Sequence, residues 1–162
     1  MHLTRPKILV IGYGNPGRCD DGLGQALGRK IEDLGIDGVT VECDYQLMVD
    51  HAAQIAESDI VVFADAMVGL DVPYKFSAIV PANPQVLGSH QVSPEAVLAL
   101  AQLLFGGAPS GWLLAIAGKE FGEVREGLST VAGANLLLAV DFLNNWLVAQ
   151  NTANVASTDG AQ

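Results

Sequence analysis

The sequence predicts an α/β protein: a three-layer αβα sandwich built on a mostly parallel, twisted, five-stranded sheet with helices on both faces, in which one strand could be antiparallel. Three observations predict this fold. Five short apolar stretches alternate with helix-like segments, which is typical of layered α/β proteins. Half of the 162 residues are hydrophobic, enough for one sizeable core but in a chain too short for two full-sized domains. A glycine-rich turn joins the first apolar stretch to the first helix.

The expected strands are the stretches at 7–13, 39–43, 59–65, 76–80 and 112–118. The first, third and fifth of them are almost wholly apolar, as strands are when both faces of the sheet are covered. We therefore expect these three strands in the middle of the sheet.

Apolar residues at helical spacing predict four helices. The first begins near Asp21, and its Gly24 and Gly28 would permit close packing against a neighbouring element. The remaining helices are expected at 46–57, at 94–105 with Ser93 as N-cap, and at 129–148, beginning at Ser129, where the segment 121–129 would provide a turn and a cap at Ser129. Residues 1–149 are expected to form a single domain. Residues 150–162 are expected to be a disordered tail, because they contain almost nothing to bury.

The composition argues against several classes of protein. The net charge is −10 and only 8 residues are Lys or Arg, which opposes binding to the phosphates of a nucleic acid. The apolar runs are interrupted before the roughly 18 residues of a membrane span, and no signal peptide is evident, so no membrane association and a cytoplasmic location are expected. Cys19 and Cys43 lack paired spacing and are expected to be free thiols.

The motif Gly12-x-Gly14-x-x-Gly17 has the spacing of a dinucleotide-binding turn. Pro16 removes one of the N–H groups that such a turn needs, and Asp20 and Asp21 place negative charge where phosphates would lie. A carboxylate at a helix N-terminus is stabilised in its ionised form and is ready to hold a cation. The loop therefore favours a cation over a nucleotide. One of the two aspartates, by preference Asp20, is expected to cap the helix.

A second acid and a histidine are expected near this loop. In a doubly wound sheet of the 2-1-3 type the first and third strands are neighbours, so Asp65, at the end of the third strand, would lie beside Asp21. His90 precedes the third helix, where the helix dipole favours the neutral imidazole that can bind a metal. His51, on the second helix, is expected to be structural or solvated, although it could approach the same crevice.

Four motifs in this order resemble those of the hydrogenase maturation endopeptidases, which trim the C-terminus of nickel-containing hydrogenase large subunits. They are GYGNPGRCDDGLG at 12–24, Asp65-Ala66, SHQVSP at 89–94 and FGEVREGLS at 121–129. The resemblance covers most of residues 7–148. It implies that Asp21, Asp65 and His90 form both the metal site and the catalytic site.

The resemblance also implies the substrate and the metal. The partner would be the precursor of a [NiFe] hydrogenase large subunit, from which a short C-terminal peptide is removed after a His or Arg near the nickel-binding cysteines. The nickel would be contributed by that substrate. Carboxylates and imidazole suit Zn or Mn equally well, so the choice of nickel comes from the family. The protein is expected to act as a monomer.

The sequence leaves alternatives for the metal ligands and for the mechanism. Many family members carry Glu where this chain has Asp21, which is a shorter ligand, and Cys19 could contribute a sulfur ligand. Metal-assisted hydrolysis is preferred over the shared-proton chemistry of aspartic proteases, with Asp20 as one candidate for the general base. The loops 66–75 and 82–92 are candidates for docking a large protein substrate.

Two other functions remain as alternatives. A receiver-type signalling domain would use Asp20, Asp21, Asp65 and Lys119 as its phospho-acceptor site, but its acid pair should end the first strand directly, and it gives His90 no role. A nucleotide-dependent enzyme would use the glycine loop and would bind NAD or NADP tightly.

Overall fold

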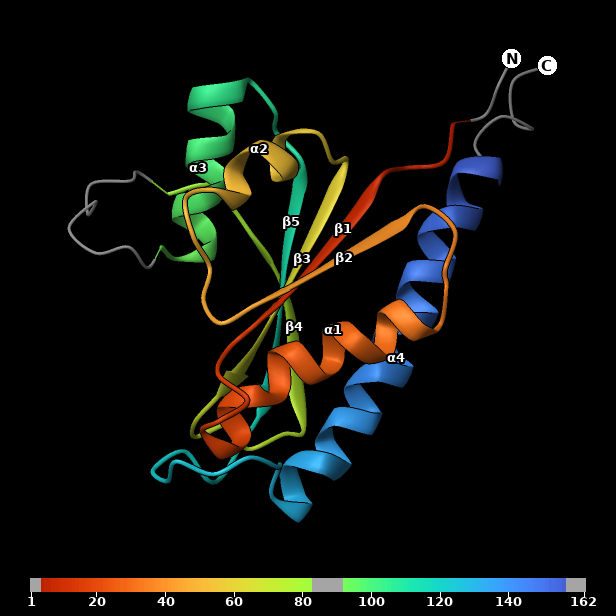
Figure 1. The fold of residues 1–162 in the computed structure, drawn as a ribbon. Helices are drawn as coiled ribbons and strands as arrows, with labels where there is room; N and C mark the ends of the chain where they lie inside the picture. The colour runs from red at the N-terminus through yellow and green to blue at the C-terminus, as the bar shows by residue number, and fades with distance from the viewer. Residues whose placement is uncertain (1–3, 83–91, 157–162) are drawn as a thin grey trace.

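The computed structural model describes residues 4–82 and 92–156. Its sheet has five strands in the order β2-β1-β3-β5-β4 (Figure 1). The strands are β1 (Ile8–Tyr13), β2 (Val39–Asp44), β3 (Ile60–Met67), β4 (Tyr74–Ile79) and β5 (Ser110–Ala117). All neighbours are parallel except β4 and β5, which are antiparallel. The predicted sheet, its three central strands and its single antiparallel strand are therefore confirmed.

Helices cover both faces of the sheet, so the predicted three-layer sandwich is confirmed as well (Figure 1). One face carries α1 (Leu23–Asp33) and α4 (Thr130–Ala156), and the other carries α2 (His51–Ala56) and α3 (Pro94–Phe105). A short 3-10 helix, η1 (Cys19–Gly22), leads into α1. Ser93 caps α3 as predicted, because its Oγ accepts a hydrogen bond from Ala96 N at 3.1 Å.

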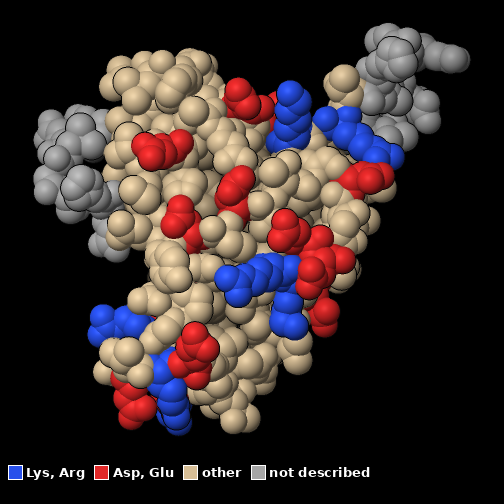
Figure 2. Space-filling model, in the orientation of Figure 1, with Lys and Arg blue, Asp and Glu red and all other residues tan. Residues whose placement is uncertain are grey.

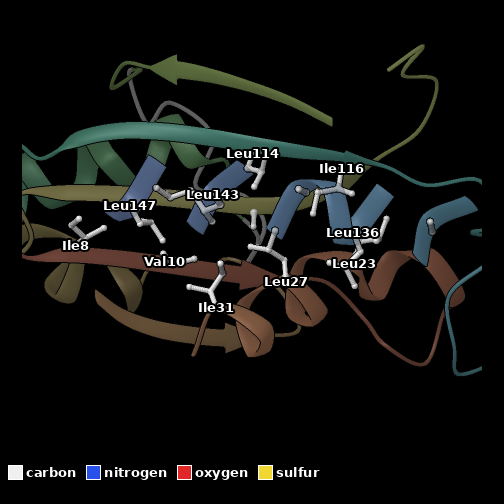
Figure 3. Packing of buried hydrophobic residues seen from close by; sticks show 14 residues of the cluster. Ile8, Val10, Leu23, Leu27, Ile31, Leu114, Ile116, Leu136, Leu143 and Leu147 are labelled. Atoms are coloured by element: carbon white, nitrogen blue, oxygen red, sulfur yellow. The ribbon is translucent and has the colours of Figure 1, made fainter. Parts of the chain in front are cut away.

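Alternation along the strands divides the core into two clusters, one for each face of the sheet. In β1, Ile8 and Val10 pack with α1 and α4, whereas Leu9 and Ile11 pack with α2 and α3. Figure 3 shows the first cluster, in which Leu27 of α1 and Leu143 of α4 point toward the strands. The same alternation decides which face each side chain takes at the carboxyl ends of the strands.

The first helix lies unusually close to the sheet. A Cβ atom on Gly24 would come within 2.2 Å of the Tyr13 carbonyl oxygen and 2.4 Å of the Ala64 carbonyl oxygen. A Cβ atom on Gly12 would in turn lie 2.1 Å from the Gly24 carbonyl oxygen. These glycines allow α1 to touch the backbones of β1 and β3, as the sequence predicted for Gly24.

Two helix boundaries were predicted wrongly. The second helix begins at His51 instead of residue 46, because Leu47 turns its side chain into the core and the Met48 N–H donates to His51 Nδ1 at 2.9 Å. The last helix continues to Ala156, past the expected boundary at 149, and Asn151 Nδ2 donates to the Asp37 carbonyl at 2.9 Å. Residues 150–156 are therefore helical, and the rest of the expected tail lies outside the described residues.

By length and composition, α4 is apolar enough over Thr130–Ala153 to cross a membrane, which the interrupted apolar runs did not predict. Three of its leucines, Leu136, Leu143 and Leu147, are nevertheless buried against α1 and the sheet. A helix with one buried apolar stripe is typical of the core of a globular protein. The expectation of no membrane association stays a prediction.

Charged side chains of both signs are mixed over the face drawn in Figure 2. Arg5 pairs with Asp37 at 2.7 Å and Arg125 with Glu120 at 2.8 Å, and both pairs are largely exposed. Exposed pairs of this kind contribute little to stability.

Candidate active site

The turn after β1 places Asp21 beside the carboxyl end of that strand. Gly14 has a φ of +138°, a conformation that favours glycine, and a Cβ atom there would lie 2.0 Å from the Asp21 carbonyl oxygen. The Asn15 N–H donates to Asp21 Oδ2 at 2.8 Å, and Gln25 Nε2 donates to the Gly14 carbonyl at 2.8 Å. The glycine-rich motif thus forms a closed turn that fixes a carboxylate.

Asp65 reaches the same place from β3. The parallel register pairs Gly12 with Ala64, so the next residues, Tyr13 and Asp65, are neighbours on adjoining strands. Strand alternation puts both side chains on the face of the sheet covered by α2 and α3. Asp65 Oδ1 accepts a hydrogen bond from Ala66 N at 2.8 Å, and Tyr13 lies beside the same carboxylate on the wall of one cleft.

Asp21 and Asp65 line one open cleft of about 480 Å³ at the carboxyl ends of β1, β2 and β3. The start of α3 forms another part of its wall. The described lining residues include two acids but no lysine, arginine or histidine. They are Tyr13, Gly14, Asp21, Tyr45, Gln46, Leu47, Asp65, Val92, Ser93 and Pro94.

The surroundings of Asp65 in the cleft disfavour its ionised form. Burial is the largest cause and the nearby charge of Asp21 adds to it, so that the pKa of Asp65 rises to about 6 despite the hydrogen bonds from Ala66 N and Tyr13. Burial and the charge of Asp65 also raise the pKa of the Tyr13 hydroxyl far above its usual value, so this group stays protonated. Among the described residues of the cleft, two carboxylates lie close together with no basic side chain on its walls, and a bound cation would relieve their repulsion.

Asp20 does not cap α1, and the preference for it as a cap was wrong. Its side chain is fully buried and turned toward the chain that follows β5. Oδ2 accepts hydrogen bonds from Lys119 N, Glu120 N and Ser129 Oγ, each at 2.8 Å, and Oδ1 accepts one from Ser129 N at 2.7 Å. With its oxygens engaged and no place in the cleft, Asp20 is not a suitable general base.

These contacts give the motif at 121–129 a structural role. The segment that follows β5 lies beside the Cys19-Asp20 turn, with Cys19 N donating to the Arg125 carbonyl and Asp20 N to the Glu120 carbonyl. Ser129 caps α4 as predicted, since its Oγ accepts a hydrogen bond from Ala132 N at 3.2 Å. The glycine-rich motif and the motif at 121–129, which are distant in the sequence, are therefore hydrogen-bonded to each other next to Asp21.

Cys19 and Lys119 lie away from the cleft. Cys19 is buried, and its Sγ donates to the Glu123 carbonyl at 3.7 Å, so the structure does not support a sulfur ligand. Lys119 lines a separate hollow with Asn135 and the loop 68–73. The residues of a receiver site, Asp20, Asp21, Asp65 and Lys119, are therefore not brought together, and that alternative is not supported.

The two remaining histidine predictions have different outcomes. His51 joins Met48 and Asp44, with Nε2 3.6 Å from Asp44 Oδ2, which agrees with a structural role. His90 lies outside the described residues. Val92, which follows it closely in the chain, lines the cleft, and its N–H donates to the Leu47 carbonyl at 3.4 Å. In residues 4–82 and 92–156, no three side chains of the metal-ligating types come together.

Tyr13 is the site residue that the sequence reasoning missed. The signal was present in the strand pattern: Leu9 and Ile11 face α2 and α3, so the next residue on that face is Tyr13. Once the first and third strands are taken as neighbours, the same alternation places Tyr13 next to Asp65. Tyr45, which is 67% exposed, is a second tyrosine on the wall of the cleft.

Comparison with known proteins supports the fold. No family model and no curated protein matches the chain. Among solved structures, it is similar to the hydrogenase maturating endopeptidase HybD from Escherichia coli, with a TM-score of 0.70 and 21% identity over 88% of this chain and 93% of the other. The [NiFe] hydrogenase maturation protease HycI from Thermococcus kodakarensis gives a TM-score of 0.67 and 21% identity, covering 88% and 92% of the two chains.

A third structure, HybD from Thermococcus kodakarensis, gives a TM-score of 0.69 at 17% identity and covers 87% of this chain and 99% of the other. These similarities span nearly the whole of each neighbour. The chain therefore has the fold of the solved hydrogenase maturation proteases, the family that its motifs resemble.

Proposed function

We propose that this protein is an endopeptidase that removes a short C-terminal peptide from the nickel-loaded precursor of a [NiFe] hydrogenase large subunit. The observation that carries the proposal is the meeting of Asp21 and Asp65 in one open cleft, at the ends of neighbouring strands. The fold shared with hydrogenase maturation proteases supports the same function.

The nickel in the precursor would be held by Asp21, Asp65 and His90. The donor set fits this role, because carboxylates and imidazole bind divalent nickel, zinc and manganese. The raised pKa of Asp65 supports it further, since a divalent cation between the acids would relieve their repulsion. The third ligand is proposed from the sequence motif at 89–94, and Val92 and Ser93 bring the chain that follows it to the cleft.

Hydrolysis would follow from holding the precursor by its own metal. Binding places the scissile peptide beside the cleft, and positioning of this kind accounts for a large part of a catalytic effect. A bound divalent ion supplies a Lewis acid for the carbonyl or for an attacking water. Asp21 and Asp65 hold their carboxylates in the cleft, where Asn15 N and Ala66 N donate to them.

A metal-independent acid pair is the second mechanism that a specific observation favours. A carboxyl with a pKa of about 6 next to a second carboxyl group resembles the shared-proton pair of aspartic proteases. Under that mechanism the precursor would be cut whether or not it carried nickel.

The deciding experiment mixes the purified protein with nickel-loaded and nickel-free precursor and follows the mass of each by mass spectrometry. Metal recognition predicts that only the loaded precursor loses its C-terminal peptide. Cleavage of both precursors would favour the acid pair, and cleavage of neither would contradict the proposed function.

Three variants test the residues. Asp21→Ala, Asp65→Ala and His90→Ala should remain folded and should lose processing of the loaded precursor. Asp33→Ala removes an exposed acid at the far end of α1 and is the matched control, which should process normally. Normal processing by all three site variants would show that the metal site is misassigned.

We also propose that the protein works in the cytoplasm as a monomer that docks the folded precursor. Light scattering of the purified protein, alone and with the precursor, measures the mass of the free protein and the mass of its complex with the precursor.

A further inference from the structure

We infer that Tyr13 is a positioning residue for Asp65: its hydroxyl holds the carboxylate in the orientation that meets the metal of the substrate. This inference rests on the proposed function, because it assigns Tyr13 a part in nickel recognition. It concerns a side chain to which the motif resemblance gave no role.

The register of the sheet explains why Tyr13 can do this. Tyr13 is the last residue of β1, and its neighbour on β3 is Asp65, one residue beyond the pair Gly12–Ala64. Both side chains point to the face covered by α2 and α3, and both line the cleft. The contact is therefore lateral, between adjoining strands of a rigid sheet.

The backbone around Tyr13 has little freedom to move. Tyr13 pairs with Asp44 of β2 on one side, and its carbonyl oxygen lies against Gly24 of α1. The phenol is thus carried by a fixed strand end, whereas a water molecule in an open cleft would exchange. A hydroxyl fixed in this way is suited to orient a ligand.

Two groups then lie against the Asp65 carboxylate. Ala66 N donates to Oδ1 at 2.8 Å, and the Tyr13 hydroxyl, placed beside Asp65 by the strand register, would be the second donor. Ala66 N belongs to the same strand and fixes the side chain only locally, so the hydroxyl supplies the orientation relative to Asp21. Residues that hydrogen-bond to metal ligands commonly change metal affinity by about ten- to a hundredfold when they are removed.

Tyr13→Phe removes the hydroxyl and keeps the ring, and Tyr74→Phe is the matched control, because Tyr74 of β4 lies outside the lining of the cleft and packs on Phe142. In protein labelled with ¹³C-aspartate, Tyr13→Phe should shift the carboxyl resonance of Asp65 at pH 8, and Tyr74→Phe should leave it in place. The resonance is assigned by its loss in Asp65→Asn. An unchanged resonance in Tyr13→Phe would overturn the inference.

Kinetics on the nickel-loaded precursor supply the second measurement. Tyr13→Phe should raise KM about tenfold or more with little change in kcat, because a displaced ligand weakens binding of the metal before and during reaction. Kinetics equal to those of Tyr74→Phe would overturn the inference while leaving the proposed function intact. If the wild type processes no precursor, the proposed function fails and the role of Tyr13 in it fails as well.

Discussion

Two adjacent aspartates in one turn have opposite surroundings. Asp21 lines the open cleft and accepts a hydrogen bond from Asn15 N, whereas Asp20 is fully buried. Burial by itself raises the pKa of Asp20, but the hydrogen bonds from Glu120, Lys119 and Ser129 outweigh it and bring the pKa below its usual range. The Asp21 carboxylate is available to a ligand, and the Asp20 carboxylate links the turn after β1 to the segment that follows β5.

Asp20→Ala should lower the free energy of unfolding by about 3 kcal/mol at pH 7, because three backbone N–H groups and the Ser129 hydroxyl lose a buried charged acceptor. Urea unfolding measures this loss, and Asp33→Ala should change stability by less than about 0.5 kcal/mol. The contribution of Asp20 is present above the unfolded pKa of about 3.9 and is lost as the pH falls through the lower folded pKa. A loss similar to that of Asp33→Ala would contradict this role.

Asp65 should show the opposite pH dependence. Its folded pKa of about 6 lies above the unfolded value of about 3.9, so the folded state binds the proton more tightly and stability falls as the pH rises between these values. An NMR titration of the metal-free protein should find this pKa. Asp21→Asn should lower the pKa of Asp65, because the variant removes a nearby negative charge, but burial should still keep this pKa above the ordinary value.

Asp65→Asn extends this prediction to stability and activity together. Without the buried charge, the variant should be more stable than the wild type at pH 8 by about 1 kcal/mol, less than the full shift implies because solvent screens part of the repulsion. The same variant should not process the precursor. Titration of Asp65 near pH 4 in the wild type would contradict both expectations.

The packing of α1 against the sheet depends on glycine residues. Gly24 lies against the carbonyl oxygens of Tyr13 and Ala64, whereas a Cβ atom on Gly133 of α4 would meet no atom of the described residues within 4 Å beyond its own helix backbone and chain neighbours. Both glycines are helical, so the same substitution meets opposite surroundings. The comparison separates helix propensity from packing.

Gly24→Ala should destabilise the protein by about 2 kcal/mol, because crowding of two strand backbones exceeds the gain of about 1 kcal/mol in helix propensity. Gly133→Ala should instead stabilise it by about 0.5 to 1 kcal/mol. Urea unfolding of the two variants measures both effects. Equal changes of the same sign would show that α1 has room to move away from the sheet.

On the scale of the whole molecule, α4 connects the active-site end to the opposite end. Ser129, just before the helix, is bound by Asp20, and Asn151 near its other end donates to the Asp37 carbonyl. Between them a stripe of leucines packs on α1 and the sheet (Figure 3). The stripe covers only part of this apolar helix, because Leu137 and Leu138 remain exposed.

Leu143→Ala should lower the free energy of unfolding by about 3 kcal/mol, because Leu143 is fully buried and its removal leaves a cavity. Leu138, which is 51% exposed on the same helix, is the control, and Leu138→Ala should cost less than about 0.5 kcal/mol. Urea unfolding followed by circular dichroism measures both. Equal and small losses would mean that α4 is not anchored in the core.

The local pattern of the sequence predicted the strands, the start of α3 at Pro94, the cap at Ser129 and the acids of the cleft. These features follow from alternation, helical spacing and capping chemistry, which act over a few residues. The end of α4 was not predictable in the same way, because residues 150–156 contain almost no large apolar side chain to mark a buried helix face. The contact of Asn151 with Asp37 comes from a segment that is distant in the sequence.

The sequence by itself therefore determined the layers, the strand ends and the presence of two acids near them. Only the tertiary structure decided which neighbouring aspartate faces the cleft, because Asp20 turns toward Lys119, Glu120 and Ser129 from the other end of the chain. It also decided that Tyr13 lies beside Asp65, since the lateral register of two strands is set by the packing of the whole sheet. The physical reason is that periodicity fixes the face on which a side chain lies, whereas its partner there depends on contacts that the local sequence does not contain.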